Sequence, residues 1–546
     1  MYDLVLRGGT LVDGNGGPAV PGDLAVRGGY IAACGVVDGP ARQELDVGGL
    51  IVCPGFIDIH SHSDLSLPDL PTADSKVRQG VTTEVVGNCG FTLAPVSADN
   101  LGALRDYLSN TVAVKGQGNM DLPWGSLGEY MDWLEQRGLS VNVATLVGQG
   151  TLRVAAMGFA EGAPDALQME HMKKLLEREL AWGAFGISAG LAYVPDCFST
   201  REELVELGRM VREAGGMFSV HLRQEGVGVF SALEEVVEVV RETGVSLQVS
   251  HLKAEGRRTW GRAADLLAYL RGLREEGLPV HADQYPYRAF GSGLQDLVPP
   301  WVRAQGVETM ARLLHDPLVR ERVKAEMSGR PGPETGWQPP LLDLRWEDIR
   351  ISHVRSEKNS PLQGMTLEQI GCLRGVDPAE AVLDLLCEEK AHVKMVAFAM
   401  DERDVRTILA DPEVMVASDG RAAAPDGPDP HARPHPRYYG TFPRVLGRYV
   451  REEGLLTLEQ AIRKMTYLPA RKLGLPDRGR LAPGMVADIC VFDADRVVDV
   501  ATFDDPHRFP EGVVHVLVNG VAVVREGSHT GARPGRVLRR PFPRAY

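Results

Sequence analysis

Eight short apolar runs recur along the chain, and this repetition constrains the fold more than any other feature of the sequence. The runs are IVCPGFIDIH, TTEVVGN, VNVATLVGQG, AFGISAG, MFSVHL, SLQVSHLK, PVHADQY and EVMVASDG. Several are separated by segments with helical periodicity, as in REELVELGRMVREAGG, where Leu204, Leu207 and Val211 fall on one helix face. Eight alternating strand and helix units predict an α/β fold of the (β/α)8 TIM-type barrel.

The two ends of the chain carry a different pattern. Residues 1–52 and 479–546 contain short strand-like runs broken by glycine turns, so we expect both ends to form one small β-sandwich. The barrel would then occupy residues 53–478. Within it, the roughly 60 residues at about 288–348 exceed a normal crossover, which predicts an inserted lid or subdomain after the seventh strand.

Composition restricts the classes of function. The formal net charge of −14 argues against binding to nucleic acid or to an anionic membrane surface, and no stretch of 18 or more apolar residues could span a bilayer. The amino-terminal residues lack the pattern of a secretory signal, so we expect a cytoplasmic location. Seven widely spaced cysteines predict no disulfide framework, and the oligomeric state is left open.

Polar side chains stand where the predicted strands end, which is where barrel enzymes place their chemistry. His60 and His62 can reach one metal ion because alternate residues of a strand point the same way. His221 and His251 are about one strand and helix unit apart, so they would occupy equivalent positions on neighbouring strands. The complete set at these strand ends is His60, His62, Asn88, Cys89, His221, His251, Lys253, Asp283, Tyr285 and Asp419.

Each of these residues alone has an ordinary structural explanation, because surface histidines form HxH pairs by chance and a lone cysteine commonly fills a core. Their joint occurrence at one end of the barrel instead predicts a metal site with the ligand types that zinc prefers. The fourth run, AFGISAG, offers no lysine for a carboxylated-lysine bridge. Cys89, as a thiolate, is therefore the candidate for bridging two metal positions.

The motifs that contain these residues resemble one family over nearly the whole chain. They are PGFIDIHSHSD, GVTTEVVGNCG, SVHLRQEG, VSHLKAEG, DQYPY, ASDG, HPRYYGTFPRVLGRYVRE, KMTYLPARKLGL and RGRLAPGMVADICVFD. PGFIDIHSH and GMVADICVFD are typical of the metal-dependent amidohydrolase superfamily. VVGNCG and HPRYYGTFPR resemble one branch of it, the N-acyl-D-amino-acid deacylases (D-aminoacylases).

The resemblance implies zinc-dependent hydrolysis of N-acyl-D-amino acids to a carboxylate and a free D-amino acid. A metal-activated water would attack the amide, with Asp419 as general base and then general acid. The implied tight zinc site consists of Cys89, His221 and His251. A second, weaker metal position is implied at His60, His62 and Asp419, with Cys89 between the two.

The resemblance also implies how the substrate is held. Lys253, Tyr285 and Arg437 correspond to positions that bind the α-carboxylate, with help from Tyr193 and Ser292. Two departures from the family pattern affect the expected rim of the pocket. Gln149 stands where many relatives have a histidine, and the segment RAAAPDGPDPHAR after Asp419 is longer than usual.

Two other functions remain as alternatives. The first is cyclic-amide hydrolysis, as in hydantoinases and dihydroorotases, against which the absent lysine on the fourth strand argues. The second is a non-catalytic scaffold protein with the same fold, against which the complete ligand set argues. Arg288 and Arg303, in the expected insertion, would suit an acidic substrate side chain, although exposed arginines are commoner than specificity arginines.

Overall fold

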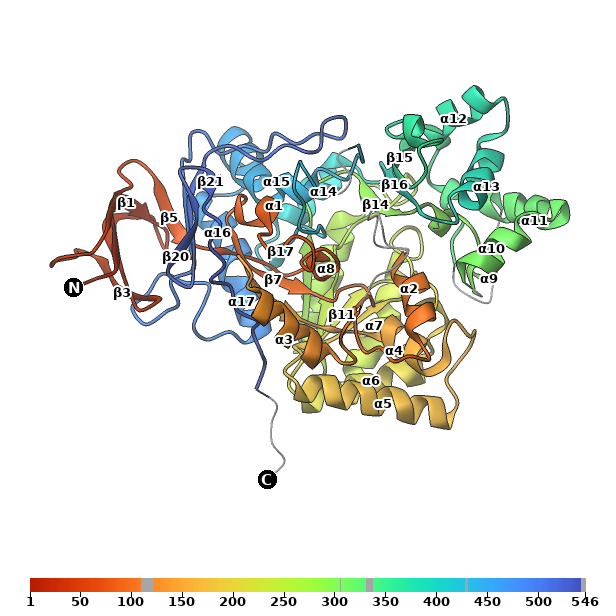
Figure 1. Ribbon diagram of the computed structural model, residues 1–546, viewed down its shortest axis with the longest axis horizontal. Coiled ribbons are helices and arrows are strands. Elements are labelled where there is room, and N and C mark those ends of the chain that lie inside the picture. Colours follow the sequence, from red (N-terminus) through yellow and green to blue (C-terminus); the bar gives the residue numbers. More distant parts are fainter. Residues whose placement is uncertain (110–121, 305, 330–336, 428–430, 542–546) are drawn as a thin grey trace.

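A barrel of parallel strands forms the centre of the molecule, as the eight apolar runs predicted (Figure 1). The computed structural model describes residues 1–109, 122–304, 306–329, 337–427 and 431–541. One arc of the barrel pairs β6 (Phe56–Asp58), β7 (Val81–Val86) and β8 (Asn142–Thr145). The other arc follows the order β9 (Val147–Gly148), β10 (Gly186–Gly190), β11 (Met217–His221), β12 (Ser246–Val249), β13 (Val280–Gln284) and β17 (Val414–Val416).

The two arcs meet at both edges, which closes the barrel. Leu146 alone separates β8 from β9, so the third run of the sequence supplies a strand to each arc. At the other edge, Ser61 and Gly420 form a parallel bridge, and the Asp419 amide donates to the His60 carbonyl at 2.9 Å. The carboxyl ends of the first and last strands therefore lie side by side.

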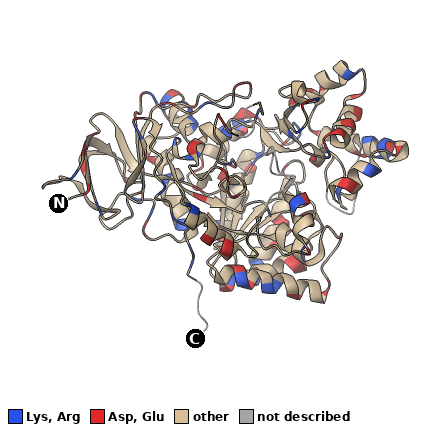
Figure 2. Ribbon diagram, in the orientation of Figure 1, with Lys and Arg blue, Asp and Glu red and all other residues tan. Residues whose placement is uncertain are grey.

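Helices surround the strands, and their apolar faces pack inward. In α6 (Arg201–Glu213) the Thr200 hydroxyl caps the first turn by accepting from the Glu203 amide, and Leu204 and Leu207 are buried. Charges of both signs are interspersed along the outer helices such as α5 (Figure 2). The helices are α1 (Asp74–Val77), α2 (Leu101–Ser109), α3 (Leu127–Arg137), α4 (Gln149–Met157), α5 (Ala166–Ala181), α6 (Arg201–Glu213), α7 (Val229–Thr243), α8 (Ala263–Glu275), α14 (Glu402–Ala410), α15 (Arg437–Arg444), the π-helix η8 (Val445–Glu452), α16 (Leu458–Met465) and α17 (Tyr467–Leu473).

Both ends of the chain build one connected sheet beside the barrel (Figure 1). Its strands are β1 (Leu4–Leu11), β2 (Val20–Arg27), β3 (Tyr30–Gly35), β4 (Glu44–Asp46), β5 (Ile51–Pro54), β18 (Ile489–Phe492), β19 (Val513–Val518), β20 (Val521–Arg525) and β21 (Ser528–His529). β5 joins the two ends because it pairs with β1 and with β18. β5 runs to Pro54, so the change from this sheet to the barrel falls two residues later than the expected boundary at 52.

The insertion after β13 is longer than the sequence indicated. Its antiparallel sheet contains β14 (Phe290–Gly293), β16 (Val393–Ala397) and β15 (Ile349–Val354), in that order. Its helices are η4 (Leu294–Leu297), α9 (Pro300–Arg303), α10 (Val307–Leu313), α11 (Pro317–Ser328), α12 (Leu367–Arg374) and α13 (Pro378–Glu388), which project from the barrel in Figure 1. The expected end at 348 is wrong, because β15 and β16 pair with β14 instead of joining the barrel.

Within the described residues, no helix is both long and apolar enough to cross a membrane. All seven cysteines are free thiols, as their spacing predicted. Cys53 and Cys490 face each other across β5 and β18, and burial raises the pKa of the Cys53 thiol well above its usual value. These two residues fill the core where the terminal sheet meets the barrel.

Candidate active site

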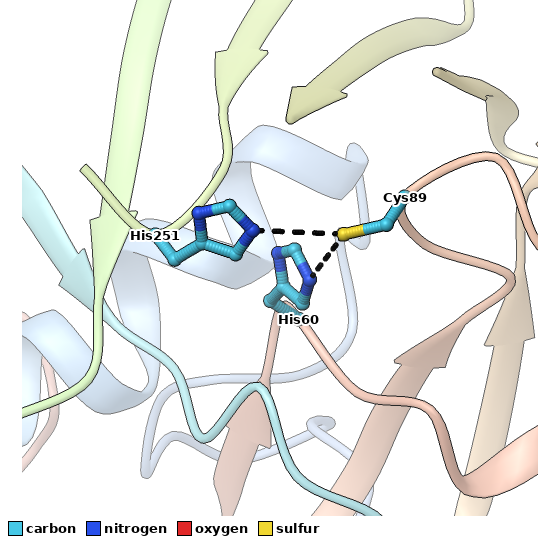
Figure 3. A group of neighbouring side chains, drawn as sticks. All are labelled: His60, Cys89 and His251. Carbon is cyan, nitrogen blue, oxygen red and sulfur yellow. Dashed lines mark hydrogen bonds between the residues drawn. The ribbon is translucent and has the colours of Figure 1, made fainter. Parts of the chain in front are cut away.

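A cysteine and three histidines from separate strands meet at the mouth of the barrel. The Cys89 sulfur lies 3.3 Å from His60 Nε2 and 3.6 Å from His251 Nε2 (Figure 3). His221 Nδ1 lies 3.9 Å from the same sulfur and 2.9 Å from His251 Nε2. Zinc bonds of 2.0 to 2.3 Å in tetrahedral geometry require ligand atoms about 3.5 Å apart. The donor set and its spacing therefore fit a zinc ion.

A second group of potential ligands adjoins the first. His62 Nε2 lies 3.2 Å and His60 Nε2 3.5 Å from one carboxylate oxygen of Asp419. His60 belongs to both groups, since its Nε2 also faces Cys89. His221 forms a third group with His251 and Glu225, so the structure brings the six side chains that the sequence proposed together in three overlapping groups. Which group holds metal more tightly stays a prediction.

The backbone at this site is unusual in a consistent way. Cys89, His251 and Asp419 each have a positive φ, at 54°, 37° and 46°. This region is uncommon for residues with a side chain, and such conformations cluster at functional sites. At Cys89 the turn is supported by glycines on both sides: a Cβ at Gly87 would lie 2.5 Å from the Leu146 carbonyl, and one at Gly90 would lie 2.3 Å from the Asp196 carboxylate. The two glycines of the motif VVGNCG are therefore required by the close packing on either side of Cys89.

The electrostatic environment keeps the acidic ligands ionised. Burial alone would raise the pKa of Asp419, but Arg437 and neighbouring histidines hold it well below its usual value. Arg437 Nη1 lies 2.8 Å from the Asp419 carboxylate. Burial likewise opposes ionisation of Cys89, yet the nearby histidines hold the pKa of its thiol well below the usual range. A carboxylate and a thiolate are the forms that bind metal.

Glu225 is a buried carboxylate at this site that the sequence reasoning missed. It lies in the loop after β11, with its carboxylate 2.6 Å from Lys253 Nζ and 3.0 Å from His251 Nδ1. Burial would raise its pKa, but Lys253 and His221 hold it well below its usual value. A carboxylate on the far nitrogen of a ligand histidine orients the ring and raises its basicity. The only available signal was the proximity of Glu225 to His221 in SVHLRQEG.

A buried ionic cluster supports the strand ends that carry His60, His62 and Asp419. Lys76 on α1 is fully buried, with Nζ 2.9 Å from Asp58 and 3.1 Å from Glu84. Glu84 accepts hydrogen bonds from the Ser61 and Ser63 hydroxyls, which alternate with the two histidines. Ser418, which precedes Asp419, accepts from Lys76 Nζ at 2.7 Å. The cluster therefore joins β6, β7 and the end of β17 beneath the metal ligands.

Two cations and a tyrosine form one wall of a pocket of about 300 Å³ that opens over these ligands. Arg437 lies 4.7 Å and Lys253 5.7 Å from the centroid of the Tyr285 ring. Burial would lower the pKa of Lys253, but Glu225 raises it above its usual value, so both cations are charged. This pair of fixed cations is suited to an anionic group such as a carboxylate.

The other expected substrate residues also line this pocket. Tyr193 packs its ring against His221, with centroids 4.7 Å apart. The Ser292 hydroxyl donates a hydrogen bond to Asp296. Arg303 lines the pocket and is ion-paired with Asp296 at 2.7 Å, whereas Arg288 is exposed and lies outside the lining.

His435 and Gln149 occupy positions that the sequence did not indicate. His435 accepts a hydrogen bond from the Arg437 amide on Nδ1, and its Nε2 lies 2.9 Å from the Ala289 carbonyl, so it ties the start of α15 to the insertion. Gln149 does not line the pocket; it is buried and donates to Ser199 and Glu203. The segment after Asp419 does reach the rim, through Arg421 and Ala432, and its residues 428–430 lie outside the described part.

Comparison with known proteins places this barrel and site in a family. A model of the amidohydrolase family matches residues 43–313 and 347–524, so the chain belongs to that family. Within it, the chain belongs to the N-acyl-D-amino-acid deacylases, as its motifs indicated. It is 39% identical to an N-acyl-D-glutamate deacylase of Alcaligenes xylosoxydans xylosoxydans over 98% of this chain and 96% of the relative.

Solved structures agree with this placement. An N-acyl-D-glutamate deacylase from Bordetella bronchiseptica, complexed with zinc and a phosphonate inhibitor, aligns with a TM-score of 0.81 and 37% identity over 98% of this chain and 99% of that one. A D-aminoacylase with a binuclear metal centre aligns with a TM-score of 0.81 and 35% identity over 99% and 100%. These matches confirm the fold class and the family that the sequence predicted.

Proposed function

We propose that this protein is a zinc-dependent hydrolase that cleaves the amide bond of N-acyl-D-amino acids. The observation that carries the proposal is a single pocket in which a zinc-type ligand set lies beside two buried cations. The ligand set can hold a zinc ion that activates water, and the two cations can bind a carboxylate. Relatives that carry the deacylase name align over the whole chain, which supports the same reaction here.

Cys89, His221 and His251 would hold the zinc ion, and His60, His62 and Asp419 would hold a second ion when one is present. When bound, zinc supplies Lewis acidity, which lowers the pKa of water and polarises an amide carbonyl. Glu225 fixes the orientation of His251 from behind, at 3.0 Å from Nδ1. The chain thus provides both the donor atoms and their support.

Asp419 is the proton carrier of the proposed mechanism. Its carboxylate faces His60 and His62 at the pocket floor, and its depressed pKa keeps it ionised before reaction. It would accept a proton from the attacking water at a carboxylate oxygen. It would then deliver that proton to the amine nitrogen as the amide bond breaks, as general base and general acid.

Lys253, Tyr285 and Arg437 would bind the substrate's α-carboxylate, with Tyr193 and Ser292 on the flanks. Arg437 offers a planar fork for a carboxylate and Lys253 a compact charge. When the α-carboxylate and the scissile carbonyl are both fixed, the hydrogen and the side chain on Cα must occupy different positions. A D and an L substrate then place their side chains in different surroundings, which permits stereoselection.

The proposal is tested with the purified protein on matched N-acetyl-D- and N-acetyl-L-amino acids with apolar, acidic and basic side chains, and on a hydantoin. We expect turnover of the D substrate, little or none of the L substrate and none of the hydantoin, since the fourth strand β10 and the residues after it supply no lysine ligand. Chelation should remove the activity and added zinc should restore it. Turnover of the hydantoin alone would favour a cyclic-amide hydrolase, and no turnover by the zinc-loaded protein would refute the proposal.

A further inference from the structure

Asp283, in the motif DQYPY, is a strand-end residue to which the mechanism proposed above gives no role. It is the fourth residue of β13, and its side chain is buried. A buried carboxylate is costly unless neighbouring groups donate hydrogen bonds to it or carry the opposite charge. The neighbours of Asp283 therefore indicate what it does.

Asp283 holds the backbone turn that presents His251. Its Oδ1 accepts a hydrogen bond from the His251 amide at 2.8 Å, and its main-chain carbonyl accepts one from the Leu252 amide at 2.8 Å. The φ of His251 is 37°, in a region that strains a residue with a side chain. Two hydrogen bonds at successive amides offset this strain and fix the direction of the His251 ring.

The same carboxylate oxygen faces a second histidine. Asp283 Oδ1 lies 3.5 Å from His60 Nδ1, a buried nitrogen that has no other hydrogen-bonding partner among the described residues. The opposite nitrogen of the ring, Nε2, faces Cys89 at 3.3 Å (Figure 3) and Asp419 at 3.5 Å. One side of the His60 ring therefore faces a supporting carboxylate, and the other faces the proposed metal ligands.

This arrangement selects one form of the His60 ring. A neutral imidazole carries a proton on one nitrogen and a lone pair on the other. A carboxylate beside Nδ1 favours the proton at that position, because an N–H group is attracted to the negative charge and a lone pair is repelled by it. The lone pair then lies on Nε2, where a metal ion requires it.

Gln248 keeps the carboxylate of Asp283 in this orientation. Gln248 comes from the neighbouring strand β12 and is buried, and its Nε2 donates to Asp283 Oδ2 at 2.7 Å. Because Oδ2 is held by this amide, Oδ1 is the oxygen that turns toward His251 and His60.

We infer that Asp283 is a positioning residue of the metal site and that it acts on two ligands at once. It holds His60 in the form with the proton on Nδ1, and it holds the backbone turn of His251. One carboxylate on β13 thus supports a ligand that follows β6 and a ligand that follows β12. The inference rests on the proposed zinc site and is independent of which amide the protein cleaves.

The test is the zinc affinity of the metal-free protein, measured by competition with a chromogenic chelator. Asp283→Asn keeps an oxygen for the His251 amide. Gln248 can turn its own amide to accept from the new NH₂ group, since its Oε1 has no hydrogen-bonding partner among the described residues. The substitution therefore removes chiefly the charge beside His60. We expect zinc affinity to fall by about 10 to 100-fold.

Asp488→Asn is the matched control. Asp488 is a buried carboxylate that accepts from the Asn519 amide at 2.7 Å and from Asn142 Nδ2 at 3.0 Å, and it lies 3.5 Å from Arg478. Asn142 begins β8, so this carboxylate is at the end of the barrel opposite the metal ligands. The control loses the same charge from similar surroundings and should bind zinc as the wild type does.

A second background assigns the effect to His60. In a His60→Gln protein the ring on which Asp283 acts is absent, so Asp283→Asn should lower zinc affinity much less than it does in the wild type. A general loss of structure would lower the affinity by the same factor in both backgrounds, and that result would overturn the role of Asp283 at His60.

A further variant carries the test if Asp283→Asn does not fold. Gln248→Met keeps the carboxylate of Asp283 but frees it to rotate, so we expect zinc affinity to fall, by less than in Asp283→Asn. Unchanged zinc affinity in this variant would overturn the inference.

The outcomes separate this inference from the proposed function. Unchanged zinc affinity in Asp283→Asn, or an equal fall in Asp283→Asn and Asp488→Asn, would overturn the inference and leave the zinc site and the deacylase function in place. Failure of the wild-type protein to bind zinc would refute the zinc site, and the proposed function with it.

Discussion

The pocket has one wall built by the barrel and one built by the insertion, and the two walls carry different kinds of side chain. On the barrel wall, every proposed metal ligand stands at the end of a strand, and the ionic cluster of Lys76, Asp58 and Glu84 beneath it is fully buried. On the wall built by the insertion, Ser292 lines the pocket from β14 and Lys394 from β16, and Arg303 is ion-paired with Asp296. The barrel wall therefore carries the proposed metal ligands and their buried ionic support, whereas the insertion contributes side chains that line the same pocket without belonging to the ligand set.

This difference assigns separate tasks to the two walls. A rigid set of donors is needed for the chemical step, which is the same for every substrate. Side chains that line the pocket away from the metal ligands instead distinguish one substrate from another. Changes on the barrel wall should therefore lower kcat for all substrates, and changes on the insertion wall should alter the ratio of kcat/KM between substrates.

The largest expected effect comes from removing the proton carrier on the barrel wall. Asp419→Asn should lower kcat by about 10³-fold or more, because general acid and base catalysis contributes 10² to 10⁴-fold and the amide cannot accept the proton. The loss should be equal for acidic and apolar N-acetyl-D-amino acids. Steady-state kinetics measure it, and elemental analysis should still find zinc. A kcat near that of the wild type would remove Asp419 from this role.

The buried cluster under the barrel wall gives the next largest effect. Lys76→Met leaves Asp58 and Glu84 without their cation, and breaking a buried ion pair costs about 3 to 5 kcal/mol. We expect the free energy of unfolding to fall by about that amount in denaturant titrations. Lys173→Met, which removes a half-exposed pair with Glu206, is the control and should cost less than about 1 kcal/mol. Equal losses in both variants would contradict the stabilising role assigned to the buried Lys76 cluster.

Glu225 provides a test of how the histidine ligand is supported. Glu225→Gln keeps the size of the side chain but removes the charge beside His251 and Lys253. Loss of such an outer carboxylate lowers metal affinity by about 10 to 100-fold. Competition with a chromogenic zinc chelator measures the affinity. An unchanged zinc affinity would show that Glu225 serves Lys253 alone.

The smallest of these effects belongs to the boundary between the two walls. Arg437→Lys keeps the charge but loses the planar fork, and we expect KM for N-acetyl-D-amino acids to rise about tenfold, with a smaller change in kcat. His435 accepts a hydrogen bond from the Arg437 amide at 3.0 Å. A substitution that removes this acceptor should therefore also raise KM. A variant that loses kcat but keeps KM would place Arg437 at the reaction and not at the carboxylate.

The barrel wall could be predicted from the sequence, and physical reasons explain why. Each strand ends at a fixed place in the barrel, so residues as distant as His60 and Asp419 must meet once the strands are assigned. The alternation of residues along a strand likewise placed His60 and His62 on one side. This reasoning did not identify Glu225, because Glu225 lies in a loop, where no periodicity relates it to His251.

The insertion wall could not be predicted in the same way. Its sheet pairs β14 with β16 and β16 with β15, and these strands are separated by long helical segments. No local pattern indicated that Lys394 would lie opposite Gly293. For the same reason the sequence placed the end of the insertion near residue 348. The ion pair between Arg303 and Asp296 was also not indicated by the sequence, which offered Arg303 as a partner for an acidic substrate side chain.

The central claim is that Cys89 and the barrel histidines hold a zinc ion at the base of this pocket. X-ray absorption at the zinc edge tests it most directly, because a thiolate ligand gives a sulfur scatterer at about 2.3 Å. We expect that shell in the zinc-loaded wild type and its loss in Cys89→Ser, together with a lower zinc content. A wild-type spectrum with nitrogen and oxygen scatterers alone would contradict the account.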